Sequence, residues 1–238
     1  MENNQYEKKP RVLCLHGHGS SAEILKKELV LGWPETVLEK LDLVFLNGPF
    51  LLQEKVDVHG IFHPPYYEWF QADKDFKKIY KFEECVQYVE ANMEKYGPFD
   101  GVLGFSQGAI LTASMPGMQR ERVALTKVPK IKFVIIISGA KFGGIQFGCP
   151  SLAANAFSSP IECPSLHFIG EKETGKPNEE ELVKCFANPV VIHHPEGHKV
   201  PNLDAESMKT VSIHKQGEEN QSAIAGELPT VTLSSPQS

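Results

Sequence analysis

A serine between two glycines, in the stretch Gly104-Phe105-Ser106-Gln107-Gly108, has the pattern that presents a nucleophilic serine at a sharp turn. The apolar residues 99–105 precede it and residues 109–113 follow, which predicts a strand, a turn at the serine and a helix. The serine of such a turn has a strained backbone, and its neighbours must be small so that strand and helix can approach. An ordinary strand-to-helix turn in which Ser106 only caps the helix would also fit this stretch.

The base that would activate Ser106 is expected late in the chain. A serine hydroxyl is a poor nucleophile until a base takes its proton, and one known arrangement has the chain order serine, acid, histidine. Four histidines follow the serine before the polar end of the chain: His167, His193, His194 and His198. The first three lie in or at the end of apolar segments, where packed or surface histidines are expected. His198 lies in the Gly/Pro-containing loop 195–201 beyond the last apolar segment, and this placement predicts His198 as the base.

The acid that would orient the histidine should follow the preceding strand. Glu171 and Glu173 both come directly after the apolar segment 165–170, and either carboxylate could hold the imidazole and stabilise its cationic form. Asp204 is the only aspartate in this part of the chain, and it follows His198, which is the wrong order. Both glutamates could also belong to a solvated turn, so the residues alone leave the choice between them open.

Two backbone N–H groups are needed to bind the oxyanion that forms when a serine attacks a carbonyl. One of them normally belongs to the residue after the nucleophile, which is Gln107. The other comes from a loop after an early strand, where His16-Gly17-His18-Gly19 stands. Glycines let the backbone approach a substrate, and we predict the backbone N–H of His18 as the second donor.

The histidines also permit a metal-binding interpretation. His16 and His18 form an H-x-H pair, and imidazole-rich sets bind zinc. However, no aspartate follows the pair closely, as binuclear hydrolase motifs require, and a metal site would leave the serine motif unexplained. We therefore predict no metal and no cofactor.

The elements that must position these residues alternate along the chain. Apolar segments of strand length are followed by helical patterns, which predicts an α/β fold with a mostly parallel sheet. The predicted strands are 11–15, 41–46, 99–105, 132–139, 165–170 and 189–194; the predicted helices are 22–31, 80–96, the segment after Ser106, and 179–186. Residues 50–75 lack periodicity and contain many prolines and aromatic residues, so they are predicted to form a long functional loop.

Composition limits the location and the partners of the chain. A net charge of −6 and the lack of a basic block argue against nucleic acid as a partner. Five scattered cysteines indicate reduced thiols, and no apolar run has the length of a signal core or a membrane span. We predict a cytosolic protein with a nuclear pool left open, and composition gives no oligomeric state. Residues 1–9 are predicted to be a flexible leader, 10–211 one domain, and 212–238 a disordered polar tail.

The motifs together resemble the FSH-type serine hydrolases, the group that includes the ovarian-cancer-associated serine hydrolase, and most of all its plant members. The segments that carry the resemblance are 13–17, 47–49, 64–70, 96–109, 137–139, 164–167, 170–171 and 197–201. They occur in family order over residues 10–204, and together they are highly specific.

The resemblance implies an α/β-hydrolase fold, with helices on both faces of the sheet, and a serine esterase or thioesterase. It implies Ser106 as the nucleophile, His198 as the base and Glu173 as the acid. It also implies that the loop 60–70 forms one wall of the substrate pocket, through Tyr66, Tyr67, Trp69 and Phe70. The family usually has Asp where Glu173 stands, and it continues after the histidine loop into an apolar helix that here begins at 203–211 and gives way to a polar tail.

Two functional hypotheses follow. The first is an enzyme that cleaves small-molecule carboxylic esters or thioesters through an acyl-enzyme on Ser106, with His198 as base. The second is a catalytically weak or inactive binding protein on a hydrolase scaffold, motivated by Glu173 and by the altered C-terminal end. The presence of both Ser106 and His198 favours the enzyme.

Overall fold

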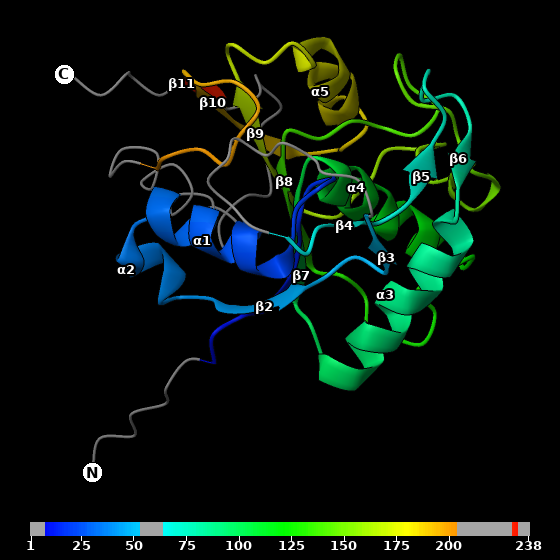
Figure 1. Cartoon of the computed structure of the whole chain (residues 1–238), viewed down its shortest axis with the longest axis horizontal. Helices are drawn as coiled ribbons and strands as arrows, with labels where there is room; N and C mark the ends of the chain where they lie inside the picture. Colours follow the sequence, from blue (N-terminus) through cyan, green and yellow to red (C-terminus); the bar gives the residue numbers. More distant parts are fainter. Residues whose placement is uncertain (1–7, 53–63, 204–229, 233–238) are drawn as a thin grey trace, which may run out of the picture.

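A parallel β-sheet forms the centre of the protein (Figure 1). The structure is a computed structural model that describes residues 8–52, 64–203 and 230–232 of the 238-residue chain. The strands of the sheet are β1 (Arg11–Leu15), β2 (Asp42–Leu46), β7 (Gly101–Phe105), β8 (Phe133–Ile137), β9 (Ser165–Gly170), β10 (Pro189–His194) and β11 (Thr230–Thr232). Their order is β11-β10-β9-β8-β7-β1-β2, and every neighbouring pair is parallel. The predicted α/β class with a mostly parallel sheet is therefore confirmed.

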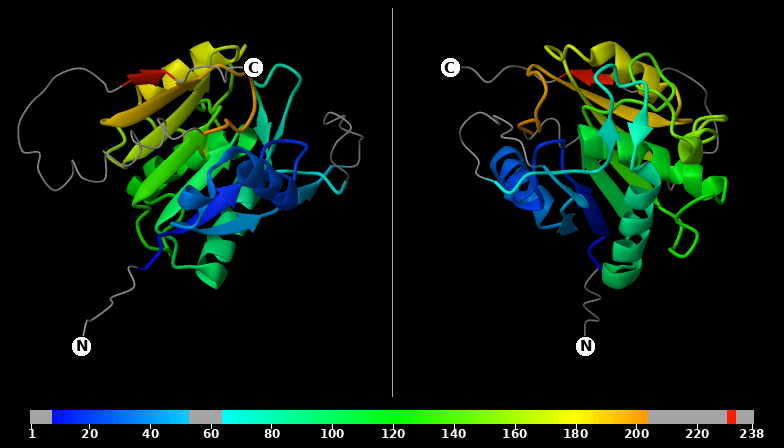
Figure 2. Two further views of the ribbon diagram at one scale, coloured as in Figure 1. Left: turned by 90° about the vertical axis from the view of Figure 1, so that its left-hand side faces the viewer. Right: turned by 45° about the vertical axis from the view of Figure 1, so that its right-hand side comes forward.

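Helices cover both faces of this sheet. They are α1 (Ala22–Gly32), α2 (Glu35–Leu38), α3 (Phe82–Tyr96), α4 (Gln107–Arg120) and α5 (Lys176–Val183), with one short 3-10 helix, η1 (Ser151–Ala153). The right-hand view of Figure 2 shows the blue helix α1 on one side of the central strands and the green-cyan helix α3 on the other. The α1 residues Leu25 and Leu29 belong to one hydrophobic core, whereas residues of α3, α4 and α5 belong to a second core on the opposite face.

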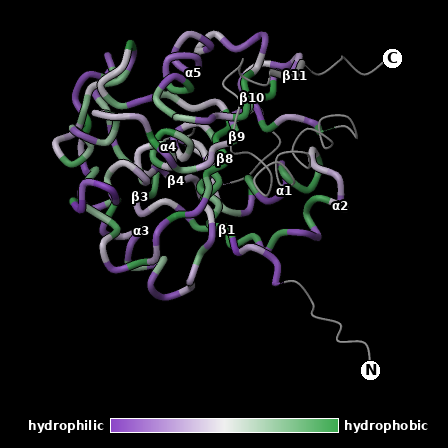
Figure 3. Tube along the Cα trace, turned by 180° about the vertical axis from the view of Figure 1, so that it is seen from behind, coloured by the Kyte–Doolittle hydropathy of each residue, from purple (hydrophilic) through white to green (hydrophobic). Residues whose placement is uncertain are grey.

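The central strands are apolar on both sides because each of them lies between these two cores. In β7, Val102 packs into the core under α3 and α4, and its neighbour Leu103 packs into the core under α1. The same alternation holds in β8 for Val134 and Ile135. Continuous apolar runs are typical of parallel strands that are covered on both faces. Figure 3 shows these hydrophobic stretches in green at the centre, with purple hydrophilic segments around them.

Most predicted elements are present, and the differences have local causes. The helix predicted over 179–186 instead runs over Lys176–Val183, because Pro177 is tolerated in a first turn and starts it earlier. Ser21 caps α1 by accepting a 3.2 Å hydrogen bond from the Ile24 N–H. The loop predicted over 50–75 contains the short strands β3 (Phe50–Leu51), β4 (Tyr67–Glu68) and β5 (Gln71–Ala72). β3 pairs with β4, and β5 pairs with β6 (Ile79–Tyr80), so the helix predicted over 80–96 begins only at Phe82.

The predicted domain limits lie partly outside the described residues. Thr230–Thr232 form the edge strand β11 beside β10, which differs from the disorder predicted for 212–238. The rest of that tail, residues 1–7 of the predicted leader and the segment 204–211 lie outside the described residues. Among the helices of the described ranges, none combines the length and the apolar character needed to cross a bilayer.

Candidate active site

The turn at Ser106 joins the end of β7 to the start of α4 with a strained backbone. Ser106 has φ 54° and ψ −117°, a conformation that L-residues rarely adopt outside functional sites. Two glycines make the turn possible, since a Cβ on Gly108 would lie 2.2 Å from the Leu15 carbonyl oxygen and one on Gly104 would lie 2.4 Å from the Gly108 carbonyl oxygen. Although Ser106 holds the N-cap position of α4, its side chain makes no capping hydrogen bond. The hydroxyl is therefore available for another partner.

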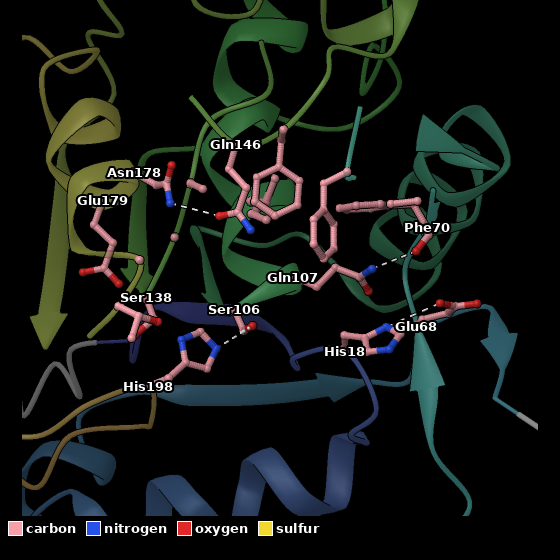
Figure 4. Close-up of a pocket in the computed structure, with 18 of the residues that line it drawn as sticks. His18, Glu68, Phe70, Ser106, Gln107, Ser138, Gln146, Asn178, Glu179 and His198 are labelled. Atoms are coloured by element: carbon pink, nitrogen blue, oxygen red, sulfur yellow. Dashed lines mark hydrogen bonds and ion pairs between the residues drawn. The ribbon is translucent and has the colours of Figure 1, made fainter. Parts of the chain in front are cut away.

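That partner is His198. Its Nε2 lies 2.8 Å from the Ser106 Oγ, and its Nδ1 lies 2.7 Å from the Glu173 Oε2 (Figure 4 shows the Ser106–His198 pair). An ionised carboxylate only accepts hydrogen bonds, so Nδ1 carries the proton and Nε2 accepts from the serine hydroxyl. The Glu173 side chain is 6% exposed whereas that of His198 is 49% exposed. The carboxylate is thus shielded from water and the imidazole is open to it.

Glu171 has other partners. Its carboxylate accepts a 2.6 Å hydrogen bond from the Lys176 Nζ, and its other oxygen lies 2.7 Å from the His193 Nδ1. The Lys176 hydrogen bond is the main cause that lowers the pKa of Glu171 below its usual value. Of the two candidate acids, the structure brings Glu173 to the imidazole and holds Glu171 elsewhere.

The loops that carry Glu173 and His198 are joined by backbone hydrogen bonds. The Glu171 N–H donates to the His194 carbonyl over 2.8 Å, and the Lys172 N–H donates to the Glu196 carbonyl over 3.0 Å. A Cβ on Gly170 would lie 2.8 Å from the same Glu196 carbonyl oxygen, so the ends of β9 and β10 approach closely only with glycine there. These contacts fix the position of Glu173 relative to His198.

The predicted oxyanion donors lie at the same edge of the sheet. Gln107 is the first residue of α4, where an N–H has no partner inside the helix. The N–H of His18 has no acceptor within the described part of the chain, while the neighbouring Gly19 N–H donates to the Tyr67 carbonyl over 3.1 Å. Both predicted donors lie next to Ser106 in the wall of one cavity.

His16 holds the loop that carries His18. Its Nδ1 donates to the Gly17 carbonyl over 2.7 Å, and its Nε2 accepts from the Gly48 N–H over 2.9 Å. Burial lowers the pKa of His16 to about 4, so the ring is neutral and both nitrogens have partners. The His18 imidazole instead lies 3.4 Å from the Glu68 carboxylate. Across the described ranges, no three His, Cys, Asp or Glu side chains gather as metal ligands would.

The Gln107 side chain has a structural role that is not among the sequence-based predictions. Its Oε1 accepts from the Trp69 backbone N–H over 2.7 Å, and its Nε2 donates to the Phe70 carbonyl over 2.7 Å. These two hydrogen bonds connect the described part of the predicted pocket loop, residues 64–70 (the aromatic loop), to the turn at Ser106. The sequence does contain a signal for this role. A glutamine directly after the serine can accept a hydrogen bond from a backbone N–H through its oxygen and donate one to a backbone carbonyl through its nitrogen.

The aromatic loop reaches the cavity through one of the four residues predicted to form its wall. Phe70 lines the cavity, whereas Tyr66, Tyr67 and Trp69 do not. The Trp69 ring is fully buried against His16, with ring centroids 5.1 Å apart, and its Nε1 donates to the His16 carbonyl over 2.7 Å. Trp69 thus packs under the predicted oxyanion loop, because a large ring with one N–H is stable where it is buried and hydrogen-bonded.

A cavity of about 960 Å³ opens beside Ser106 (Figure 4). Its apolar lining residues include Phe70, Phe76, Tyr80, Ile110 and Phe147. Its polar lining residues include Glu68, Asp73, Ser138, Gln146, Glu173, Asn178 and Glu179. Ser138 and Glu179 were not singled out from the sequence. Ser138 could have been, because it ends the most apolar predicted strand at the sheet edge where Ser106 also lies.

Comparisons with known proteins show the family of this chain. The model of a family described as serine hydrolase (FSH1) matches residues 4–210. The chain is 32% identical over 215 residues to esterase FUS5 of Gibberella fujikuroi, covering 86% of this chain and 85% of that protein. It is 28% identical to esterase OVCA2 of Danio rerio over 80% of this chain and 90% of that protein. A 29% match to dihydrofolate reductase of Schizosaccharomyces pombe covers 80% of this chain but only 44% of that protein.

The fold also has solved counterparts. Acyl-protein thioesterase 2 of Zea mays superposes with a TM-score of 0.56 at 18% identity, over 90% of this chain and 95% of that one. A carboxylesterase of Mesorhizobium loti gives the same TM-score at 15% identity, over 90% of each chain. At these identities the likeness shows the fold alone, and the fold is that of the α/β-hydrolase esterases, as predicted.

Proposed function

The chain belongs to the FSH1 family of serine hydrolases, and from that membership we propose that it cleaves carboxylic esters or thioesters through an acyl-enzyme on Ser106. The observation that carries the proposal is the continuous chain of hydrogen bonds from Glu173 through His198 to Ser106. Each atom in it has the donor or acceptor character that proton transfer from the serine requires.

Acylation begins when the Ser106 Oγ attacks the carbonyl carbon of the substrate and the His198 Nε2 takes the hydroxyl proton. The Glu173 carboxylate stabilises the imidazolium through its hydrogen bond with Nδ1. The backbone N–H groups of His18 and Gln107 bind the oxyanion of the tetrahedral intermediate. When the intermediate collapses, the C–O or C–S bond breaks and His198 gives its proton to the leaving alcohol or thiol.

Deacylation repeats these steps with water as the nucleophile. The half-exposed His198 takes a proton from a water molecule that attacks the acyl carbon, and the carboxylic acid leaves as Ser106 regains its proton. One donor of an oxyanion hole typically contributes about 10²–10³-fold to kcat. No cofactor enters any of these steps.

The experiment that tests the proposal is hydrolysis of p-nitrophenyl butyrate and of a butyryl thioester by the native protein. We expect both to be hydrolysed, and we expect Ser106→Ala and His198→Ala to lower kcat by at least about 10³-fold each. Lys199→Ala is the matched control, since Lys199 is next to the base in the chain but its side chain pairs with Glu196, and this variant should retain activity. Turnover by Ser106→Ala equal to that of the native protein would overturn the proposal.

The alternative, a weak or inactive binding protein, was motivated by the glutamate at position 173. A hydrogen bond of 2.7 Å from His198 to Glu173 supports the enzyme instead, because the longer side chain still reaches the imidazole. A native protein that binds esters but does not turn them over would favour the alternative.

We also propose a reducing compartment, the cytosol or the nucleus, as the location. All five cysteines are within the described residues, and none forms a disulfide. Microscopy of a fluorescent fusion tests the location, and exclusive secretion would contradict it.

A further inference from the structure

Two exposed aromatic side chains stand where the cavity meets the surface. Phe76 is 42% exposed and Tyr80 is 49% exposed, and both residues also line the cavity beside Ser106. They belong to the hairpin of β5 and β6, which lies at the right-hand edge of the molecule in Figure 1. Exposed apolar side chains that gather in one patch mark an interaction surface, and this patch continues into the lining of the cavity.

The hairpin holds Phe76 in a strained backbone conformation. Its φ is 57°, in the left-handed region that a bulky residue rarely adopts. The Phe76 N–H donates to the Asp73 carbonyl over 3.0 Å, and the Asp73 Oδ1 accepts from the N–H groups of Lys77 and Lys78 over 2.7 and 3.1 Å. Backbone strain and the exposure of a phenyl ring both destabilise the protein by itself. A partner that covers the ring would give both features a function.

A second loop, residues 141–149, adds a third exposed apolar side chain to this patch. The Lys77 Nζ donates to the Ile145 carbonyl over 3.0 Å, and the Gly148 N–H donates to the Phe76 carbonyl over 2.7 Å. The Ile145 side chain is 63% exposed. These hydrogen bonds connect the loop to the hairpin and place Ile145 in one surface with Phe76.

The same surface is basic, although the whole chain has a net charge of −6. The hairpin segment 73–81 contains four lysines and two aspartates, and all four lysines are exposed: Lys74, Lys77, Lys78 and Lys81. The ammonium groups of Lys74 and Lys78 have no hydrogen bond or ion pair with any residue that the structure describes. These two charges are therefore available to an external anion. The four lysines together with Phe76, Tyr80 and Ile145 are called the hairpin face below.

Apolar side chains among lysines fit the surface of a membrane that contains anionic lipids. Aromatic rings are stable at the level of the lipid headgroups, and each lysine close to an anionic membrane surface strengthens binding. The connection to the cavity favours a membrane over a protein partner, because an apolar ester that is dissolved in the lipid could enter the cavity without crossing water. Phe147, whose ring centroid is 5.3 Å from that of Phe76, and Ile110, one helical turn after Ser106, supply an apolar lining for this path.

We propose that the hairpin face docks on membranes that contain anionic lipids, and that apolar esters pass from the lipid into the cavity beside Ser106. The docking surface is independent of the proposed hydrolase function, whereas the transfer of an ester to Ser106 rests on it.

Co-sedimentation with vesicles tests the docking surface without any need for catalysis. The native protein is mixed with vesicles of phosphatidylcholine alone and with vesicles that also contain about 30% phosphatidylserine. We expect binding to the anionic vesicles only, and we expect that binding to weaken at least about tenfold in about 0.5 M salt, which screens exposed charges.

Two variants remove the two parts of the hairpin face separately. Lys74→Glu combined with Lys78→Glu should weaken binding to the anionic vesicles at least about tenfold. Phe76→Gly should weaken it about fivefold through the loss of apolar contact. Because glycine adopts a positive φ readily, the Phe76→Gly protein should fold at least as stably as the native protein.

Matched controls change the same residue types elsewhere. Lys127→Glu combined with Lys130→Glu changes two exposed lysines before the amino end of β8, whereas the cavity lies at its carboxyl end. Tyr96→Ala removes an aromatic ring that is 41% exposed at the end of α3 and does not line the cavity. Neither control should weaken binding to the anionic vesicles.

Hydrolysis measured in two settings tests the transfer of an ester. The variant with both Lys74→Glu and Lys78→Glu should hydrolyse p-nitrophenyl acetate in water at the native rate. With p-nitrophenyl dodecanoate dissolved in the anionic vesicles, its rate should fall at least about tenfold, in parallel with binding.

Native protein that does not bind the anionic vesicles, or hairpin-face variants that bind them as tightly as the native protein, would overturn the docking inference and leave the proposed function intact. Equal rates of native protein and lysine variant on the vesicle-dissolved ester would overturn the transfer of the ester. Native protein that binds the vesicles as expected but hydrolyses no ester would overturn the proposed function and the transfer, and would support the docking surface.

Discussion

The Nδ1–H of His198 donates a 2.7 Å hydrogen bond to the Glu173 Oε2, in a position where the family resemblance implies an aspartate. The second carboxylate oxygen of Glu173 accepts from the Gly175 N–H over 3.2 Å. Both carboxylate oxygens of Glu173 therefore accept a hydrogen bond, and one of them lies against the His198 imidazole. The proposal that Glu173 is the acid of the triad can therefore be tested by substitution.

Glu173→Gln should lower kcat by about 10²–10⁴-fold, because the amide cannot stabilise the imidazolium and can select the wrong histidine tautomer. Steady-state kinetics on a p-nitrophenyl ester measures the effect. Glu171→Gln is the matched control and should stay within a few-fold of the native rate, since Glu171 pairs with Lys176 and His193. The reverse order of effects would place the acid at Glu171.

Gln107→Ala should loosen the aromatic loop. The change leaves the Trp69 N–H and the Phe70 carbonyl without the partners they have now, which should lower the free energy of unfolding by about 1–3 kcal/mol. Hydrogen exchange should become faster over residues 66–72, and kcat/KM should fall because the cavity wall moves. Gln87→Ala, on the exposed face of α3, is the control. Hydrogen exchange that is unchanged over residues 66–72 would contradict the role of Gln107 in holding this loop.

Gly108→Ala should prevent normal folding of the turn, because the added Cβ would lie 2.2 Å from the backbone oxygen of Leu15. Backbone cannot give way as a side chain can, so the expected loss exceeds the ~1–3 kcal/mol of ordinary overpacking. Gly175→Ala places its Cβ at 3.5 Å from the nearest atom and should change the melting temperature little. Thermal unfolding of both variants checks the prediction, and a Gly108→Ala protein as stable as the native one would refute it.

Glu179 should make the folded state less stable as the pH rises. Its pKa is about 8 in the folded protein and near the ordinary 4.5 when unfolded, so the folded state binds the proton more tightly. Stability is therefore full below about pH 4.5 and is lost progressively up to about pH 8. Glu179→Gln removes the group that ionises. At pH 5 the free energy of unfolding of this variant should exceed that of the native protein by close to zero.

At pH 9 the same gain should be on the order of 1–4 kcal/mol, since one pKa unit corresponds to about 1.4 kcal/mol. Melting temperatures at the two pH values measure it, with Glu180→Gln as the exposed control. A gain that is equal at pH 5 and pH 9 would show that Glu179 does not carry the pH dependence. A cost of this kind at a cavity wall is consistent with selection for function over stability.

The strands and the serine turn could be predicted from the sequence because their signals are local. β1, β9 and β10 begin and end where their apolar runs begin and end. The glycine pattern predicts Ser106 and the loop position predicts His198, and neither signal needs knowledge of distant contacts. The chain order of the groups then limited the acid to Glu171 and Glu173.

The features that could not be predicted depend on contacts between distant segments. The burial of Trp69 under the loop of His16, instead of in the cavity wall, follows from packing between residues 53 positions apart. The separate partners of Glu171 and Glu173 follow from the joining of two loops. In the sequence Glu179 is one of several charged residues in a polar helix, and only the fold shows that it is buried in the lining of the cavity that Ser106 also lines.

The most direct test of the account is labelling of Ser106 by a fluorophosphonate probe. The probe reacts with a serine hydroxyl only when a neighbouring base activates it. We predict that the native protein is labelled on Ser106, as located by peptide mass spectrometry, and that Ser106→Ala and His198→Ala are not labelled. A native protein that stays unlabelled, or that is labelled at another residue, would contradict the claim that Ser106 is an activated nucleophile.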